Sequence, residues 1–144
     1  MSGGISAQRN IAEQAVAATS VEPQSSGAAT IHGGWIDRYA HGDAQSCILH
    51  QAAGAISGSP SASSITSIIE DSVDGSTLAG TVSGSGSPAA LTAQNTESQV
   101  GVDLSAARRY VRITMTVAFT GGTSPAALVY GDLVFGGEQE LPAT

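Results

Sequence analysis

The sequence predicts an all-β fold, an antiparallel β-sandwich of jelly-roll or immunoglobulin-like type with about seven to eight strands. Three observations predict it. Residues 109–119 alternate apolar and polar side chains with period two. Short apolar runs recur along the chain, separated by Gly, Ser, Pro and Asp, and no pattern of helical period lies between them. We therefore expect strands joined by turns rather than an α/β fold.

The chain begins with a segment unlike the rest, and residues 1–27 are expected to form an arm. Larger apolar side chains are sparse there, and turn-forming residues close the segment at 23–27. Residues 7–19 have helical propensity, but their apolar stripe is too thin to hold a helix without a partner surface. The arm is thus expected to be extended or weakly helical. Its candidate partner-binding residues are Arg9, Ile11, Val16 and Val21.

The sandwich is expected over residues 28–136, with a C-terminal tail at 137–144. The clearest strand, 109–119, places Thr114 on a wet face and four residues in the core, namely Val111, Ile113, Met115 and Val117. Asp74 and Gly75 predict the turn of a tight hairpin. The other predicted strands are residues 30–36, 46–51, 64–71, 77–83, 99–104 and 127–135.

Composition limits both the core and the partners. Of the 144 residues, 73 are Ala, Gly, Ser or Thr, so the larger apolar groups suffice for one thin core. The 12 carboxylates outnumber the 5 cations, all arginine, and the net charge is −7. Such a surface repels phosphate backbones and anionic lipids, so neither nucleic acid nor a membrane is expected as a partner.

The chain shows no sign of export. Its first residues lack the apolar core of a secretory signal, and no stretch approaches 18 consecutive apolar residues. Cys47 is the only cysteine, which excludes an intrachain disulfide and suits a reducing compartment. We expect synthesis in a cytoplasm.

Several groups of residues could be combined into chemical sites. His32, His41, His50 and Cys47 could be combined into a zinc site, but only Cys47 and His50 are close in sequence. Residues 70–76 suggest a calcium loop, yet Val73 stands at a position that requires an oxygen ligand. Serine is abundant, but no Gly-x-Ser-x-Gly motif occurs. We expect no metal, no cofactor and no enzymatic activity.

The arginines and the tryptophan allow two interpretations each. Arg108, Arg109 and Arg112 could bind carboxylates of a partner, although pairing with the chain's own acidic residues is the stronger interpretation. Trp35, the single tryptophan, is interpreted as a core residue rather than a ligand platform.

Several segments resemble small β-sandwich proteins of tailed bacteriophages, the head decoration or cement proteins. The match covers residues 30–136. The segments that carry it are Trp35-Ile36-Asp37-Arg38-Tyr39, Ser46-Cys47-Ile48-Leu49, Gly54-Ala55-Ile56-Ser57-Gly58, residues 69–77 and Arg109-Tyr110-Val111-Arg112-Ile113.

The resemblance implies a virion structural protein without catalytic residues. Cement proteins of this kind bind the outer capsid surface and bridge subunits of the major capsid protein, often as homo-oligomers such as trimers. Residues 70–76 and 109–113 also resemble hairpins of jelly-roll carbohydrate-binding modules. A carbohydrate-binding module and another virion component, such as a tail or fibre-base protein, therefore stay open as alternatives.

Overall fold

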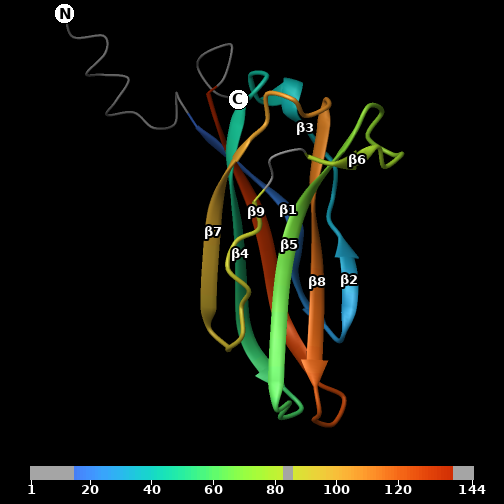
Figure 1. Ribbon diagram of the computed structural model, residues 1–144, viewed down its shortest axis with the longest axis vertical. Helices are drawn as coiled ribbons and strands as arrows, with labels where there is room; N and C mark the ends of the chain where they lie inside the picture. The colour runs from blue at the N-terminus through green and yellow to red at the C-terminus, as the bar shows by residue number, and fades with distance from the viewer. Residues whose placement is uncertain (1–14, 83–85, 138–144) are drawn as a thin grey trace, which may run out of the picture.

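The computed structural model describes residues 15–82 and 86–137, and this part of the chain is built almost wholly from β-strands (Figure 1). Its one helical element is a 3-10 turn, η2 (Arg38–His41). No helix in the described residues is long and apolar enough to cross a membrane. The strands are β1 (Val16–Ser26), β2 (Ala29–His32), β3 (Ile36–Asp37), β4 (Ser46–Ser57), β5 (Ala62–Ser72), β6 (Gly80–Thr81), β7 (Thr96–Asp103), β8 (Tyr110–Thr120) and β9 (Ala126–Gly136).

The strands form two antiparallel sheets packed face to face (Figure 1). The first sheet has the order β1-β9-β4-β7, and the second has the order β2-β8-β5-β6. Strands β2 and β3 pair with successive parts of β8 and so share one edge position. Because β1 and β2 lie in different sheets, the order is that of a jelly roll and not of an immunoglobulin domain. The predicted all-β sandwich is confirmed.

The N-terminal boundary of the sandwich corrects the prediction. Residues 16–26 form β1, an edge strand paired with β9, and do not belong to an arm. Val21 is wholly buried and Val16 packs against the core. Register shifts between Thr19 and Gln24 break the alternation that would have marked the strand in the sequence. Residues 1–14 and 138–144, with Arg9, Ile11 and most of the predicted tail, lie outside the described residues.

Two predicted strands are shorter than expected. The run at 30–36 divides at residues 33–35, where Gly33 approaches the β8 backbone so closely that a Cβ would lie 2.8 Å from the Ile113 carbonyl oxygen. The run at 77–83 reduces to β6, because the Asp74 carboxylate accepts hydrogen bonds from the backbone N–H groups of Ser76 and Thr77 and extends the turn. The hairpin is therefore real but not tight.

The core contains the four apolar residues that the alternation along β8 predicts. Val111, Ile113 and Met115 are wholly buried, and Val117 is nearly so. Thr114 points to the opposite face, as predicted, but it is buried rather than wet, and its hydroxyl donates a hydrogen bond to the Glu70 carboxylate. Trp35 is half-buried and stays outside the core; its neighbour Ile36 is buried instead.

Two polar side chains cross the interior from the first sheet to the second. The amide nitrogen of Gln51 donates to the carbonyl oxygens of Ile65 and Ala89 and to the Ser98 hydroxyl, while its oxygen accepts from Ser67. Gln51 thereby ties β4 to β5, to β7 and to the segment after β6.

The second crossing comes from β1. The Ser20 hydroxyl accepts a hydrogen bond from the backbone N–H of Ile113 and donates to the Gly34 carbonyl oxygen. It occupies the gap between β2 and β3 and satisfies a backbone donor of β8 that no strand reaches there.

Ile113→Ala should lower the free energy of unfolding by about 2 to 5 kcal/mol, because it removes a wholly buried side chain and leaves a cavity between the sheets. Thr116→Ala, at an exposed position of the same strand, should cost about 0.5 kcal/mol or less. Denaturant titration measures both. Equal losses would contradict the assignment of the two faces of β8.

Gln51→Leu should destabilise the protein by about 1 to 3 kcal/mol, since it leaves buried hydrogen-bonding partners on β5 and after β6 unsatisfied. Gln99→Leu makes the same chemical change at an exposed position of β7 and is the matched control. If both variants unfold at the wild-type denaturant concentration, the crossing by Gln51 contributes nothing to stability.

Candidate partner-binding surface

One end of the sandwich carries most of the charge, and it is called here the upper end, as in Figure 1. It comprises η2, β3, the turn between β5 and β6, and the start of β8. Each arginine of the described residues forms an ion pair there: Arg38 with Asp43 at 3.0 Å, Arg108 with Asp71 at 3.2 Å, Arg109 with Asp37 at 2.8 Å, and Arg112 with Glu70 at 3.0 Å. Arginine pairing within the chain, the stronger of the two interpretations, is confirmed for these residues.

Arg38 is the buried member of this set. Its guanidinium donates hydrogen bonds to the carbonyl oxygens of Ala44, Ala107 and Arg108 at 2.6, 2.9 and 3.3 Å. These acceptors belong to the segments before β4 and before β8. Arg38 therefore holds two crossover connections against η2 and gives the upper end a fixed shape.

Two tyrosine rings lie beside the arginines of this end. The Arg109 guanidinium lies 5.2 Å from the ring centre of Tyr39 and 5.1 Å from that of Tyr110. Hydrogen bonds from Arg109 hold the pKa of Asp37 below its usual value despite partial burial. Across Tyr110, the turn after β5 exposes Val73 and Leu78. We call Tyr39, Val73, Leu78, Arg109 and Tyr110 the tyrosine patch.

The turn after β5 is held rigidly against this patch. Gly75 has a φ of +75°, and a Cβ built on it would lie 3.1 Å from the Tyr110 ring. The Asp74 carboxylate accepts hydrogen bonds from Ser72, Ser76 and Thr77, which hold its pKa well below the usual value. Asp74 thus closes a turn, as the non-calcium interpretation predicted, while Gly75 takes the left-handed conformation.

A second cluster lies on the outer face of the second sheet. Arg112 stacks on the Trp35 ring at 4.2 Å and donates to Glu70, which also accepts from Thr114. Burial raises the pKa of Glu70, but the hydrogen bonds from Thr114 and Arg112 outweigh it and lower that pKa overall. His32 lies 3.7 Å from the same carboxylate. The polar groups of this cluster therefore serve as hydrogen-bonding and ionic partners for one another.

The outer face of the first sheet has a charged centre. His50 on β4 places Nδ1 2.6 Å from Oδ1 of Asp132 and Nε2 3.1 Å from Oε2 of Glu97. Burial opposes the charged imidazole, but the hydrogen bonds to Asp132 and Glu97 prevail and raise the pKa of His50. The ring of Tyr130 meets His50 edge-on at 6.5 Å.

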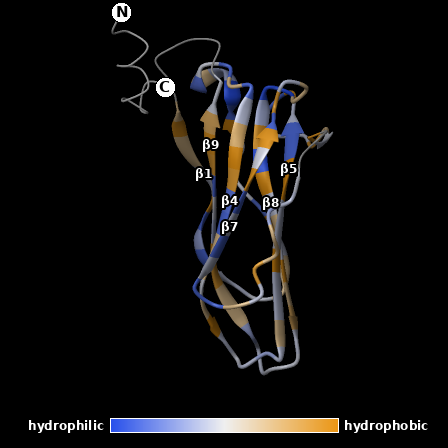
Figure 2. Cartoon of the chain, turned by 60° about the vertical axis from the view of Figure 1, so that its left-hand side comes forward, coloured by the Kyte–Doolittle hydropathy of each residue, from blue (hydrophilic) through white to orange (hydrophobic). Residues whose placement is uncertain are grey.

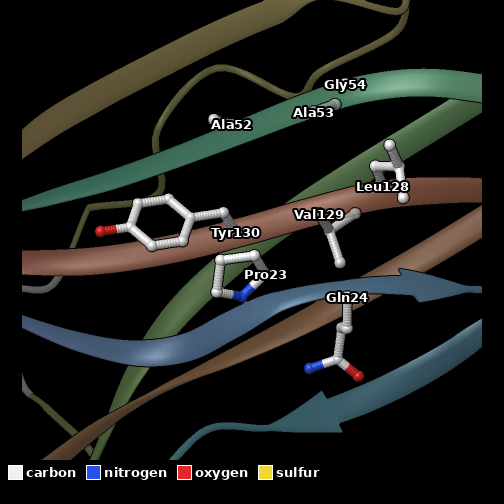
Figure 3. Close-up of a pocket in the computed structure, with 8 residues that line it drawn as sticks. All are labelled: Pro23, Gln24, Ala52, Ala53, Gly54, Leu128, Val129 and Tyr130. Carbon is white, nitrogen blue, oxygen red and sulfur yellow. The ribbon is translucent and has the colours of Figure 1, made fainter.

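Beside His50, a shallow groove of about 380 Å³ crosses the same face (Figure 3). Its lining comes from three strands, with Pro23 on β1, Ala52 and Gly54 on β4, and Leu128 and Tyr130 on β9. In Figure 3, Leu128 and Tyr130 flank Val129 along β9. The groove is apolar and open to solvent.

The structure separates the residues of the imagined zinc site. Cys47 is buried in the core, whereas His50 points to the outer face of the same strand. Burial raises the pKa of the Cys47 thiol to about 12. His41 stacks on Phe135, with ring centres 5.5 Å apart, at the end of η2. In the described ranges 15–82 and 86–137, no group of three or more His, Cys, Asp or Glu side chains could hold a metal ion.

The structure describes only two of the four predicted partner-binding residues, so the set stays a prediction. Val16 and Val21 belong to the sandwich, while Arg9 and Ile11 lie outside the described residues. The sequence patterns do not single out Tyr39, Val73 or Leu78 as binding residues, although all three are large and exposed at the upper end. One signal was available: Val73 is an apolar residue inside an otherwise polar turn segment.

Comparison with known proteins adds no assignment. No model of a known protein family matches the sequence, and a search of curated proteins gives no significant match.

The His50 cluster predicts a pH-dependent stability. Because folding raises the pKa of His50, its contribution is fully present below the unfolded pKa of about 6.5 and is lost as the pH rises through the folded value. His50→Gln should therefore cost more stability at pH 6 than at pH 9, and Asp132→Asn should remove the same pH dependence. Denaturant titration across this range measures it; parallel curves for wild type and both variants would contradict the prediction.

Proposed function

We propose that this chain is a structural protein of a tailed-phage virion. It binds the outer surface of the capsid, bridges subunits of the major capsid protein and stabilises the shell, without catalytic activity. It assembles as a homo-oligomer, with a trimer as the first candidate, and is made in the host cytoplasm. The acidic charge of the chain supports a partner other than the packaged nucleic acid.

The observation that carries the proposal is the jelly-roll strand order. Jelly rolls are a recurrent architecture of capsid and lectin domains, and the order agrees with the sandwich that the resemblance implies. Fold alone does not define function, so the position of the resembling segments matters. Four of the five lie at the upper end: residues 35–39, 46–49, 69–77 and 109–113.

The pairing of charges also favours a binding role. The arginines of the described residues are engaged with carboxylates of the same chain, and Glu70 and Asp74 are held by neighbouring donors. Such groups stabilise a fixed surface. A rigid surface loses little conformational freedom when it binds, which favours docking on a repeated lattice.

Particles that lack the protein should release their DNA at a lower temperature than complete particles, and adding the purified chain should restore the original transition. The physical reason is linkage, since a ligand that binds only the intact shell stabilises it. A DNA-binding dye during a thermal ramp reports the release. Equal release temperatures with and without bound protein, or a chain that never co-sediments with capsids, would overturn the proposal.

Deleting residues 2–14 should leave a folded sandwich, because β1 begins at Val16, but should weaken attachment to capsids. A chain in which residues 2–14 are replaced by Gly and Ser keeps the length and removes Arg9 and Ile11. Loss of attachment in both variants assigns the effect to those side chains. Wild-type co-sedimentation of both would show that the segment takes no part.

Glycan binding is the alternative that the jelly roll leaves open. A glycan array with the purified chain tests it directly. Specific binding to a sugar, together with no affinity for capsids, would move that function ahead.

A further inference from the structure

The four strands of the first sheet contain carboxylates and no arginine. Their carboxylates are Glu22, Glu97, Asp103 and Asp132. The arginines of the described residues lie in η2, before β8 and on β8, and each has a carboxylate partner there. The fifth arginine of the chain is Arg9, in the segment 1–14. A cation that approaches the first sheet therefore meets carboxylates with no arginine beside them.

Along the outer face of this sheet, an acidic region lies between two apolar regions. On the upper side, Ile48 on β4 is 38% exposed. On the lower side lies the groove with Leu128, which is 49% exposed. Between them His50 contacts the carboxylates of Asp132 and Glu97, and we call these three residues the acidic centre. Two carboxylates around one imidazole leave an excess of negative charge even when the ring is protonated.

The three regions follow one another at regular positions along β4. Ile48, His50 and Gly54 belong to one row on the outer face, because side chains alternate along a strand. Gly54 is level with Leu128, since a Cβ built on Gly54 would lie 3.2 Å from the Leu128 Cβ. The order along β4 is thus apolar, acidic and apolar, with steps of two residues (48 to 50) and four residues (50 to 54).

The segment before β1 has a complementary order at the same spacing. Ile11, Arg9 and Ile5 are separated by steps of two residues (11 to 9) and four residues (9 to 5). In an extended chain these odd-numbered residues face one side, with Ala7 between them. An extended segment that runs antiparallel to β1 therefore places two apolar side chains over the apolar regions and the cation over the acidic centre.

The place where the segment joins the sheet allows this path. Val16 pairs with Phe135, and Phe135 pairs with Cys47, so β1 starts level with the start of β4. In Figure 2, β1, β9 and β4 stand side by side in this order, with β1 at the edge. Residues 12–15 span up to about 13 Å, which suffices to reach a second layer of chain about 10 Å above the sheet.

We propose that residues 5–11 dock in extended form on the outer face of the first sheet of the same chain. Ile5 enters the groove, Arg9 binds the acidic centre, and Ile11 covers Ile48. Apolar burial at both ends and an ion pair in the middle stabilise the contact. A partner that uses the groove must then displace this segment. The purified chain is enough to test the contact, so the result does not depend on the capsid function.

A nitroxide spin label on Ser6→Cys reports the position of the segment, because it broadens nearby amide signals in the NMR spectrum. Residue 6 faces away from the sheet in the docked form, and the buried Cys47 thiol does not react with the label. Amides of residues 48–54 and 128–132 should be broadened, and those of residues 73–78, in the turn after β5, should not. Broadening at residues 73–78, or equally weak broadening throughout, would overturn the proposal.

Exchanging Arg9 and Ile11 in the labelled chain keeps the composition of the segment and breaks its match with the sheet. This variant should lower the ratio of docked to released chains about fivefold or more, because it loses apolar burial at Ile48 and the ion pair. Exchanging Gln8 and Asn10, on the opposite side of the segment, is the matched control and should keep the original broadening. Equal broadening in the two exchange variants would show that the spacing has no part in docking and would refute the proposal.

The sheet provides the reciprocal test. Leu128 in the groove and Leu78 in the turn after β5 are both 49% exposed, so a change to Ser makes one chemical change on two surfaces. Leu128→Ser should release the segment about tenfold, whereas Leu78→Ser should leave the broadening as it is. Thermal unfolding checks that each variant keeps the sandwich. If both variants retain full broadening, the groove does not hold Ile5 and the proposal fails.

A mixture of two preparations identifies the chain that supplies the segment. One preparation carries the spin label, and the other carries the isotope label and no spin label. Sharp signals from the outer face in this mixture support docking within one chain. Broadened signals there assign the segment to a second copy and overturn docking within one chain.

Discussion

The buried amide of Gln51 fixes the position of one sheet against the other. Half of the chain is Ala, Gly, Ser and Thr, so large apolar side chains are few, and most of those few fill the space between the sheets. Gln51 satisfies its amide in that space by bonding to β5, β7 and the segment after β6. A polar network with every member paired specifies one arrangement, because any slip leaves buried groups unsatisfied. Ser20 acts in the same way between β1 and β8.

Because large apolar side chains are few, the positions that they occupy are informative. Burial accounts for Phe135, Leu49 and Ile113, as expected of a core. Tyr39, Val73 and Leu78 are not buried, although an exposed polar residue would fit those positions equally well. Their concentration at one end, on turns held by Arg38 and Asp74, is what distinguishes that surface from the lower end. The charged cluster around His50 marks the sheet face as a separate feature with its own pH response.

The fold class could be predicted because apolar and polar side chains alternate regularly along β8, which lies inside its sheet between β2 and β5. Strand β1 could not, since its register shifts place both Ser20 and Val21 inside and hide the period of two. The pairing of the arginines was expected, but their partners come from 37 to 72 residues away for Arg108 and Arg109, and short-range patterns carry no such information. For the same reason the sequence did not reveal that Arg109 lies against the rings of both Tyr39 and Tyr110.

Cys47 makes the protein a convenient object for chemical labelling. It is the only thiol of the chain, it lies in the core, and its pKa is raised to about 12, so almost none of it is the reactive thiolate at neutral pH. A maleimide dye or a thiol-reactive heavy-atom cluster would therefore not react with Cys47. A cysteine introduced at an exposed site would carry the whole signal, which allows fluorescence energy transfer or gold labelling to measure the orientation of single molecules without first removing a natural cysteine.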